Sequence, residues 1–584
     1  MHLSSRLAFS SLLALGLAAT VVTACSSAGS TTGDQTNPGS GGSSAGAGGS
    51  EGGGTDGGAG TINVAGSGGS AGTIGVGGNT NPNPTDCQTA LGQPSNVGCE
   101  FWAVDLDNEP ATGLSPNSAA SPWALVLSNT GTLPAEVTIE QNDAPVGQPA
   151  QIKVFKTLTL APGQLANQLM PSREVDGSVK PGEGVPPGTW LSSNAFRIRS
   201  TAPIVVYQFN TATNSFSNDA SLLLPTNALG TQYRVLGWPT ANPIEIALPG
   251  VPDIPSIPDH TYITVVGVVP DTHVKIQPTW RVQAGGPIAL TQPGQVIEAT
   301  LQPFDVLNLE SDGATNQELV GGKPLCDFTG SAVQSDRPVA VFTGNERASA
   351  SGGPEFNPPD MQPGDTGCCT DHLEEQLFPL SSIGRKFIVT RSPIRSKGGF
   401  KEPDVLRFMG AAATTEVTTS LPAPHDKFTL KPGETHQVSV VDDVIVTATE
   451  PVVIGQILVS QSYCNGTLTG DPSLTIYAPT EQYRQDYLFL VPNSWDSNYV
   501  VISAPVGATI SIDDTTPGCE VTAIGQLDGV EYESRRCAVG EGTHTMAGDK
   551  PFGIVAYGYG SAGSYAFVGG ADVRPIYQPP PIIN

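Results

Sequence analysis

TAPIVVYQFN, which spans Thr201–Asn210, is one of four segments that share a pattern. The others are DRPVAVFTGNE from Asp336, EPVVIGQILVS from Glu450 and DKPFGIVAYGYG from Asp549. In each, a proline precedes a short run of mostly β-branched and aromatic residues; the prolines are Pro203, Pro338, Pro451 and Pro551. A proline at the first position of a strand removes no ladder donor, and the run after it is typical of a buried strand. The sequence therefore predicts four such strands, one in each of four repeated units.

The residues around these strands repeat as well. An apolar strand, a turn of small residues and an alternating strand precede each copy, beginning at Pro122, Thr261, Val405 and Tyr499. Three units then carry a Pro-Gly pair before an apolar segment, near Pro162, Pro293 and Pro432, whereas the fourth keeps only VGEGTHTM near Gly540. Similar linking segments start at Asp219, Asp371 and Asp471. A period of roughly 100 to 140 residues is far longer than a solenoid repeat, so it predicts domain-sized modules.

The fold class follows from the strand pattern. Alternating segments such as THVKIQP from Thr272 leave one apolar face per strand, which a second sheet must cover. We predict an all-β chain of about four tandem β-sandwich-like modules, with a β-propeller as the alternative architecture. The predicted repeats are residues 86–240, 241–395, 396–496 and 497–584, the last including a C-terminal tail.

The N-terminus predicts export. Residues 1–24 contain one base, Arg6, then an apolar run that ends in small residues, which is typical of a signal peptide. Val22-Thr23-Ala24-Cys25 resembles the bacterial lipobox, so Cys25 is predicted to be lipidated. An ordinary signal peptide cut near Ala24 is the alternative. Residues 25–85 are predicted to be a lipid-anchored, disordered Gly/Ser-rich linker, because such a composition buries too little apolar surface to fold. Serines after Cys25 favour an outer-membrane lipoprotein, displayed on the cell surface or facing the periplasm.

Composition excludes one class of partner. The formal net charge is −27 over 584 residues, with 14% charged residues. Such a chain is repelled by nucleic-acid phosphates and by anionic lipid, so no nucleic-acid partner is expected. The charge otherwise indicates solubility.

The cysteines indicate an oxidising compartment. Nine cysteines less Cys25 leave an even number, which suits an exported, disulfide-bonded chain. Local pairing predicts a Cys87–Cys99 bond and a Cys519–Cys537 bond. Four further disulfide candidates stay without an assigned partner, namely Cys326, Cys368, Cys369 and Cys464.

No catalytic motif was found in the sequence. HExxH and HxH patterns are absent, and no GxSxG nucleophile elbow occurs, since the GxSxG matches lie only in the Gly/Ser-rich linker. CCTDHLEE contains potential zinc ligands or an acid and base pair (Cys368, Cys369, Asp371, His372, Glu374 and Glu375), but no second pair of soft ligands completes a zinc site. Disulfides and a turn are the preferred interpretation there. Asp105 and Asp107 are weak calcium candidates that lack the rest of an EF-hand loop, and no cofactor is expected.

Several linked motifs resemble the IgG-Fc-binding protein N-terminal domain family. They are NVGCEFWAVDLDN (Asn96–Asn108), PIVVYQFN, FSNDASLLLP, VAVFTGNE, CCTDHLEEQLFP and GSYAFVGG (Gly563–Gly570). The likeness covers about Cys87 to Pro575. It implies a secreted, β-rich, non-enzymatic binding module. It supplies no defined contact motif, so no binding residue is carried over, and it does not imply binding of IgG itself.

The predicted function is therefore recognition. We expect a surface-exposed lipoprotein, held to the membrane by its N-terminal lipid, that binds a glycoprotein, polysaccharide or cell-surface partner through exposed loops or an edge strand. A self-associating structural protein of the envelope and an exported hydrolase are the alternatives.

Overall fold

The computed structural model describes residues 83–110, 117–178, 188–212, 217–241, 258–319, 325–359, 361, 369–493, 495–561 and 563–583. The predicted signal peptide, Cys25 and residues 25–82 of the predicted linker lie outside the described residues. Strands dominate the described part, which confirms the all-β prediction. Its helices are short: α1 (Cys87–Gly92), α2 (Asn316–Leu319) and the 3-10 turns η1 (Thr226–Ala228), η2 (Pro354–Phe356), η3 (Leu380–Ser382), η4 (Gln461–Tyr463) and η5 (Thr480–Gln482). None of these described helices is long and apolar enough to cross a membrane.

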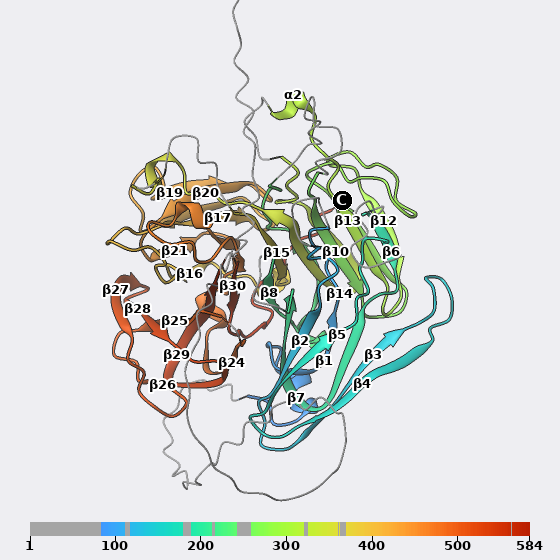
Figure 1. Cartoon of the computed structure of the whole chain (residues 1–584), viewed down its shortest axis with the longest axis horizontal. Helices are drawn as coiled ribbons and strands as arrows, with labels where there is room; N and C mark the ends of the chain where they lie inside the picture. The colour runs from blue at the N-terminus through green and yellow to red at the C-terminus, as the bar shows by residue number, and fades with distance from the viewer. Residues whose placement is uncertain are drawn as a thin grey trace, which may run out of the picture. The chain divides into compact units, whose positions relative to one another are not determined.

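The strands form five sheets that make four modules (Figure 1). The first module is one sheet of β1 (Gly98–Ala103), β2 (Trp123–Asn129), β3 (Ala135–Asn142), β4 (Ile152–Leu160), β5 (Leu165–Met170), β7 (Phe196–Asn210) and β8 (Asp219–Leu222). The second is one sheet of β6 (Trp190–Ser192), β9 (Gly230–Arg234), β10 (Thr261–Gly267), β11 (Thr272–Gln277), β12 (Ile297–Leu301), β13 (Val306–Glu310), β14 (Ala332–Ala348) and β15 (Asp371–Gln376).

The third module has two four-stranded sheets. One contains β16 (Lys386–Val389), β18 (Thr415–Thr419), β19 (Lys427–Leu430) and β21 (Val444–Ala448), and the other β17 (Asp404–Gly410), β20 (Thr435–Val440), β22 (Val452–Leu458) and β23 (Leu474–Ile476). The fourth module contains β24 (Arg484–Val491), β25 (Ser497–Pro505), β26 (Ile510–Ile512), β27 (Glu520–Leu527), β28 (Val530–Ala538), β29 (Gly542–Gly560) and β30 (Gly563–Val568). These sheets are sandwich-like modules and not the blades of a propeller.

All four modules share one pairing pattern around the proline-led segments. In each module, two earlier strands pair with different halves of the extended stretch that contains the proline-led segment. In the first module β2 and β3 pair with the two halves of β7, and in the second β10 and β11 pair with the two halves of β14. In the third module β17 pairs with β22 and β18 with β21, and in the fourth β25 and β26 pair with the two halves of β29.

The predicted position of the prolines needs correction. Only Pro451 precedes its strand, β22, whereas Pro203, Pro338 and Pro551 lie inside β7, β14 and β29. In those strands, residues 201–203, 336–338 and 549–551 have no ladder partner among the described strands. Each proline therefore lies where the strand changes partners, the one interior position at which a missing N–H costs no ladder bond.

An equivalent turn in three modules joins two strands that do not pair with each other: β4 to β5, β12 to β13 and β19 to β20. At its third position the backbone N–H of Gly163, Phe304 and Gly433 donates to the carbonyl of Asn129, Gly267 and Gly410, at 3.0, 3.1 and 2.8 Å. The second module's turn is therefore Gln302–Asp305 and not the predicted segment near Pro293. Phe304 holds a positive φ of 77° there, a conformation that favours glycine, while its side chain is fully buried. In the fourth module the corresponding strands, β27 and β28, do pair as a hairpin, and the predicted segment near Gly540 instead begins β29.

The linking segments join neighbouring modules. Each is a strand, a proline, a 3-10 turn and a second strand, as in β8, Pro225, η1 and β9. The first strand of each link pairs within its own module and the second pairs with the next: β9 joins β14, β16 joins β21 and β24 joins β29. The strands β8, β15, β23 and β30 also contact one another in cyclic order, and β8, β15 and β30 are labelled near one another in Figure 1.

Backbone hydrogen bonds between the segment before β1 and the segment after β30 join the first module to the fourth. The Asn96 N–H donates to the Ala571 carbonyl at 3.1 Å, and the Val573 N–H donates to the Pro94 carbonyl at 2.9 Å. The hydrophobic core is shared in the same way, since single clusters contain residues of the first and second modules, of the second and third, of the third and fourth, and of the first and fourth.

Candidate binding groove

A groove of about 870 Å³ lies between the second and third modules. One wall comes from the residues after β9 and after β14, and the other from the β18–β19 loop and β20. The lining side chains are mostly apolar or small, with two acids; those used below are Trp238, Phe356, His425, Gln437, Ser439 and Asp442. A volume in this range suits a peptide-sized or drug-sized ligand.

Arg407 of β17 fixes the floor of the groove. Its guanidinium lies 4.4 Å from the Trp238 ring centroid and donates through Nε to Gln437 Oε1 at 2.9 Å. It also donates through Nη1 to the Gly237 carbonyl at 2.7 Å and pairs with Asp327 Oδ2 at 2.9 Å. The two walls are therefore tied together by one buried cation, and Trp238 and Gln437 are held in position before any ligand arrives.

The strand β20 offers a free backbone edge to the groove. It stands at the end of its sheet and pairs with β17 alone among the described strands. The Gly410 N–H donates to the Glu434 carbonyl, which sets the register, so His436 and Val438 bond to β17 while Gln437 and Ser439 direct their N–H and C=O groups outward. An extended peptide is the ligand that such an edge can bind.

The rim carries a histidine pair and acidic side chains. His425 Nδ1 lies 2.8 Å from His436 Nε2, and the His436 ring stacks on Phe428 with centroids 3.9 Å apart. Partial burial, with a smaller effect from His425, lowers the pKa of His436. Glu355 and Asp442 are exposed at the rim. Asp442 pairs with Lys401 at 3.7 Å, so Glu355 is the rim acid outside an ion pair among the described residues, and its charge favours a neutral or basic ligand.

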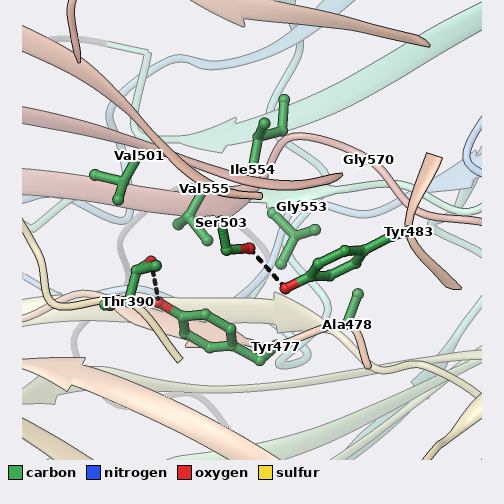
Figure 2. A pocket seen from close by; sticks show the side chains of 11 residues that line it. Thr390, Tyr477, Ala478, Tyr483, Val501, Ser503, Gly553, Ile554, Val555 and Gly570 are labelled. Atoms are coloured by element: carbon green, nitrogen blue, oxygen red, sulfur yellow. Dashed lines mark hydrogen bonds between the residues drawn. The ribbon is translucent and has the colours of Figure 1, made fainter. Parts of the chain in front are cut away.

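A second cavity is too small to bind a ligand (Figure 2). Its volume of about 10 Å³ has room for no more than a single water. Figure 2 shows Tyr477 and Tyr483 beside it; Tyr477 Oη donates to the Thr390 carbonyl at 2.7 Å, and Tyr483 Oη lies 2.6 Å from Ser503 Oγ. These bonds satisfy buried hydroxyls, so this cavity is a packing feature.

The two predicted disulfides between cysteines close in the sequence are present, and the other cysteines differ from one another in their bonding. Cys87–Cys99 and Cys519–Cys537 are bonded. Cys464 is a buried free thiol, which contradicts its prediction as a disulfide cysteine. Cys326 is also a thiol, which donates to the Asp312 carbonyl at 3.5 Å, so its predicted disulfide is wrong as well. Burial raises the pKa of each thiol to about 12. Cys369 is disulfide-bonded, and Cys368 lies outside the described residues.

The predicted turn at CCTDHLEE is wrong, because Asp371–Gln376 is the buried strand β15. The side chains of His372 and Glu374 are fully buried, with His372 Nε2 3.6 Å from Glu374 Oε2. Burial lowers the pKa of His372 to about 3, so the imidazole is neutral. The sequence did not indicate a buried strand because five of the six residues of β15 are polar, although all six are buried.

The calcium candidates separate in the structure. Asp105 accepts the Arg173 N–H at 2.7 Å. The Asp107 carboxyl instead lies against the carboxyls of Glu310 and Glu346 of the second module. Burial raises the pKa of both aspartates well above the usual value.

Sequence reasoning missed the groove residues. Trp238, Arg407 and Gln437 come from three segments that only the packing of two modules brings together. The one usable signal was the repetition of the linking segments, which indicates contact between modules without saying which side chains meet.

Comparison with known protein families gives a match that covers more than half of the chain. The family described as IgGFc binding protein matches residues 219–558, which run from the start of β8 into β29 and include the whole groove. The predicted resemblance was broader, since it also included most of the first module. No curated protein matches the chain.

Proposed function

The chain belongs to the IgGFc binding protein family, and we propose that it is a non-enzymatic recognition protein that binds an extended segment of an extracellular protein in the groove between its second and third modules. The observation that carries this proposal is the unpaired edge of β20 beside a preformed apolar wall. The family match supports a binding role and covers every residue of the groove.

The free edge of β20 binds the backbone of a ligand strand, which does not depend on the ligand's side chains. The outward N–H and C=O groups of Gln437 and Ser439 would bond to the backbone of a bound strand, as in β-strand addition. Because Arg407 already orders Trp238 and Gln437, little conformational entropy is lost when the ligand binds.

The walls define the chemistry of the segment. Side chains of one face of the ligand would lie against Trp238 and Phe356, which favours apolar or aromatic residues at every second position. Glu355 at the rim favours lysine or arginine at one end of the segment, whereas Asp442 already pairs with Lys401. The bound segment is therefore extended, alternating and basic.

Peptide selection tests this directly. A phage-displayed library of random peptides is selected on the immobilised whole chain, and the binders are measured with Ser439→Pro and with Ser439→Ala. Proline removes the outward N–H and leaves the ladder to β17 intact, so we expect a loss of affinity of about tenfold or more, the equivalent of one hydrogen bond. Alanine keeps the N–H and is expected to bind as the wild type does.

Hydrogen exchange locates the ligand. Selected peptides should protect the amides of Gln437 and Ser439, and immobilised IgG Fc and a glycan array serve as parallel probes. Equal binding by both Ser439 variants, or binding confined to glycans, would overturn the proposal.

We propose further that the chain is exported and anchored on the outer membrane through Cys25. Support comes from the signal-peptide and lipobox pattern and from disulfides, which persist in oxidising compartments. Labelling of intact cells with an impermeant reagent tests exposure, and protection of the chain until the outer membrane is opened would place it on the periplasmic side.

Self-association is a second candidate because of β4. This strand ends its sheet, and Ile152 and Val154 are 44% and 52% exposed. Exposed apolar edge strands are sites of strand pairing between molecules. Light scattering of the wild type and of Val154→Lys tests self-association. A wild-type dimer that dissociates in the lysine variant supports this function, and a wild type that is monomeric at all concentrations excludes it.

A further inference from the structure

Three potential metal ligands meet at the ends of adjacent strands in the second module. His260 precedes β10, Glu310 ends β13 and Glu346 lies near the end of β14. The register pairs Tyr262 with Glu310 and Thr261 with Asn345, so His260, Glu310 and Glu346 lie at the same end of three neighbouring strands. Their ligand atoms all lie within 4.8 Å of one another.

A fourth carboxylate comes from the first module. Asp107 is 3% exposed, and its carboxyl lies against those of Glu310 and Glu346. Its Oδ2 atom is buried and accepts no hydrogen bond from the described part of the chain. A buried acceptor without a donor costs about 1 to 3 kcal/mol unless something else satisfies it.

The ligands are oriented by their neighbours. His260 Nδ1 donates to the Ser311 carbonyl at 2.7 Å, which leaves the Nε2 lone pair available. The Glu310 carboxylate accepts Asn308 Nδ2 at 3.0 Å and Gln283 Nε2 at 2.8 Å. Glu346 Oε2 accepts the His260 N–H at 2.6 Å. Such outer contacts are typical of metal ligands, because they fix tautomer and orientation.

Among the described residues these carboxylates have no salt-bridge partner, although Arg347 lies close enough to Glu346 to interact with it electrostatically. The nearby cation, Arg347, pairs with Glu109 at 3.2 Å and with Asp259 at 3.1 Å. No ion pair among the described residues reaches Asp107, Glu310 or Glu346. Either protons or a bound cation must therefore compensate the three buried carboxyl groups.

We propose that Asp107, His260, Glu310 and Glu346 bind a divalent metal ion that joins the first module to the second. One imidazole nitrogen with three carboxylates suits Zn²⁺ or Mn²⁺ better than Ca²⁺, which prefers oxygen ligands alone. His260 is the half-buried member, so the ion enters past its ring. The site is structural, since all four positions are filled by protein groups.

Metal binding to the whole purified chain tests this. After treatment with EDTA, the chain is supplied in turn with Zn²⁺, Mn²⁺ and Ca²⁺, and bound metal is counted by elemental analysis while the melting temperature is followed. We expect one ion per chain and a rise in melting temperature with Zn²⁺ or Mn²⁺ and a smaller rise with Ca²⁺.

Asp107→Asn separates a metal ligand from a structural carboxylate. In EDTA the variant should be about as stable as the wild type, because the amide replaces a carboxyl group that must hold a proton when no cation is bound; with metal it should lack the rise in melting temperature. Asp496→Asn, an exposed acid outside both sites, is the control and should respond as the wild type does. A wild type that binds none of the three metals, or a rise in melting temperature that Asp107→Asn retains, would overturn the proposal.

Discussion

Single carboxylates hold the centre of the molecule together. Asp219, the first residue of β8, accepts Ser473 Oγ at 2.7 Å and the N–H groups of Leu474 and Glu374 at 3.1 and 3.3 Å. These donors belong to the second and third modules, so one side chain of the first module bonds to both. Burial nevertheless raises the pKa of Asp219 to about 8, against the hydrogen bonds that lower it.

This carboxyl makes stability depend on pH. A folded-state pKa above the unfolded value of 3.8 means that the folded chain holds a proton that the unfolded chain has released. The stabilisation is complete below pH 3.8 and is lost as pH rises through about 8. His372 acts in the opposite direction, but only below 6.5, because its pKa is lowered to about 3. Between pH 6.5 and 8 we expect the free energy of unfolding to fall by about 1.4 kcal/mol per pH unit from Asp219 alone.

Denaturation by urea at several pH values measures this, with Asp219→Asn as the comparison. The variant should be less stable at pH 6.5, since its amide turns a donor toward backbone N–H groups, and its stability should fall less steeply up to pH 8. Equal slopes for the two proteins would show that Asp219 does not hold the proton.

Among the elements, the long bent strands carry the fold. In β14, the first half pairs with β9 and β11 and the second half with β10 and β15, and Pro338 lies between them. The same arrangement in β7 and β29 lets one strand join two sets of partners.

Because Pro338 lies where β14 changes partners, substitution at this position should be tolerated unusually well. Pro338→Ala should change the free energy of unfolding by less than about 1 kcal/mol, because this position has no ladder partner. Val341→Pro, three residues later, should destabilise strongly, since Val341 is fully buried and pairs with Val265 of β10. Thermal unfolding of both variants decides the matter, and comparable losses would contradict the assigned switch point.

At the level of the whole molecule, the modules are not independent domains. Tyr207 of the first module donates to the Gly569 carbonyl after the fourth module at 3.2 Å. Leu236, Val453 and Ile457 lie in one core cluster, although they come from the second and third modules. The strands β9, β16 and β24 each pair with the sheet that follows them in the chain.

A single predicted repeat should therefore not fold alone. Residues 396–496 lack β16, the partner of β21, and contain β24, whose partner β29 is absent from the fragment. Their core cluster would also be open where Val501 and Tyr557 pack. We expect this fragment to show no hydrogen-exchange protection, whereas the whole chain unfolds in one cooperative transition by calorimetry. A protected fragment with its own sharp transition would contradict the shared core.

The order of the residues along the chain was enough to predict local structure. The repeated proline-led runs predicted β7, β14, β22 and β29, because alternation and β-branching reflect contacts with the nearest neighbours in a sheet. The two local disulfides were predicted for the same reason, since their cysteines are close in the sequence.

Tertiary structure alone decided where those strands meet. It brought Trp238 to Arg407 across two modules, and Asp107 to Glu310 and Glu346, and it left Cys464 as a thiol in the core. Contacts between residues this far apart depend on how whole sheets pack, and packing has no signature in the spacing of residues along one chain.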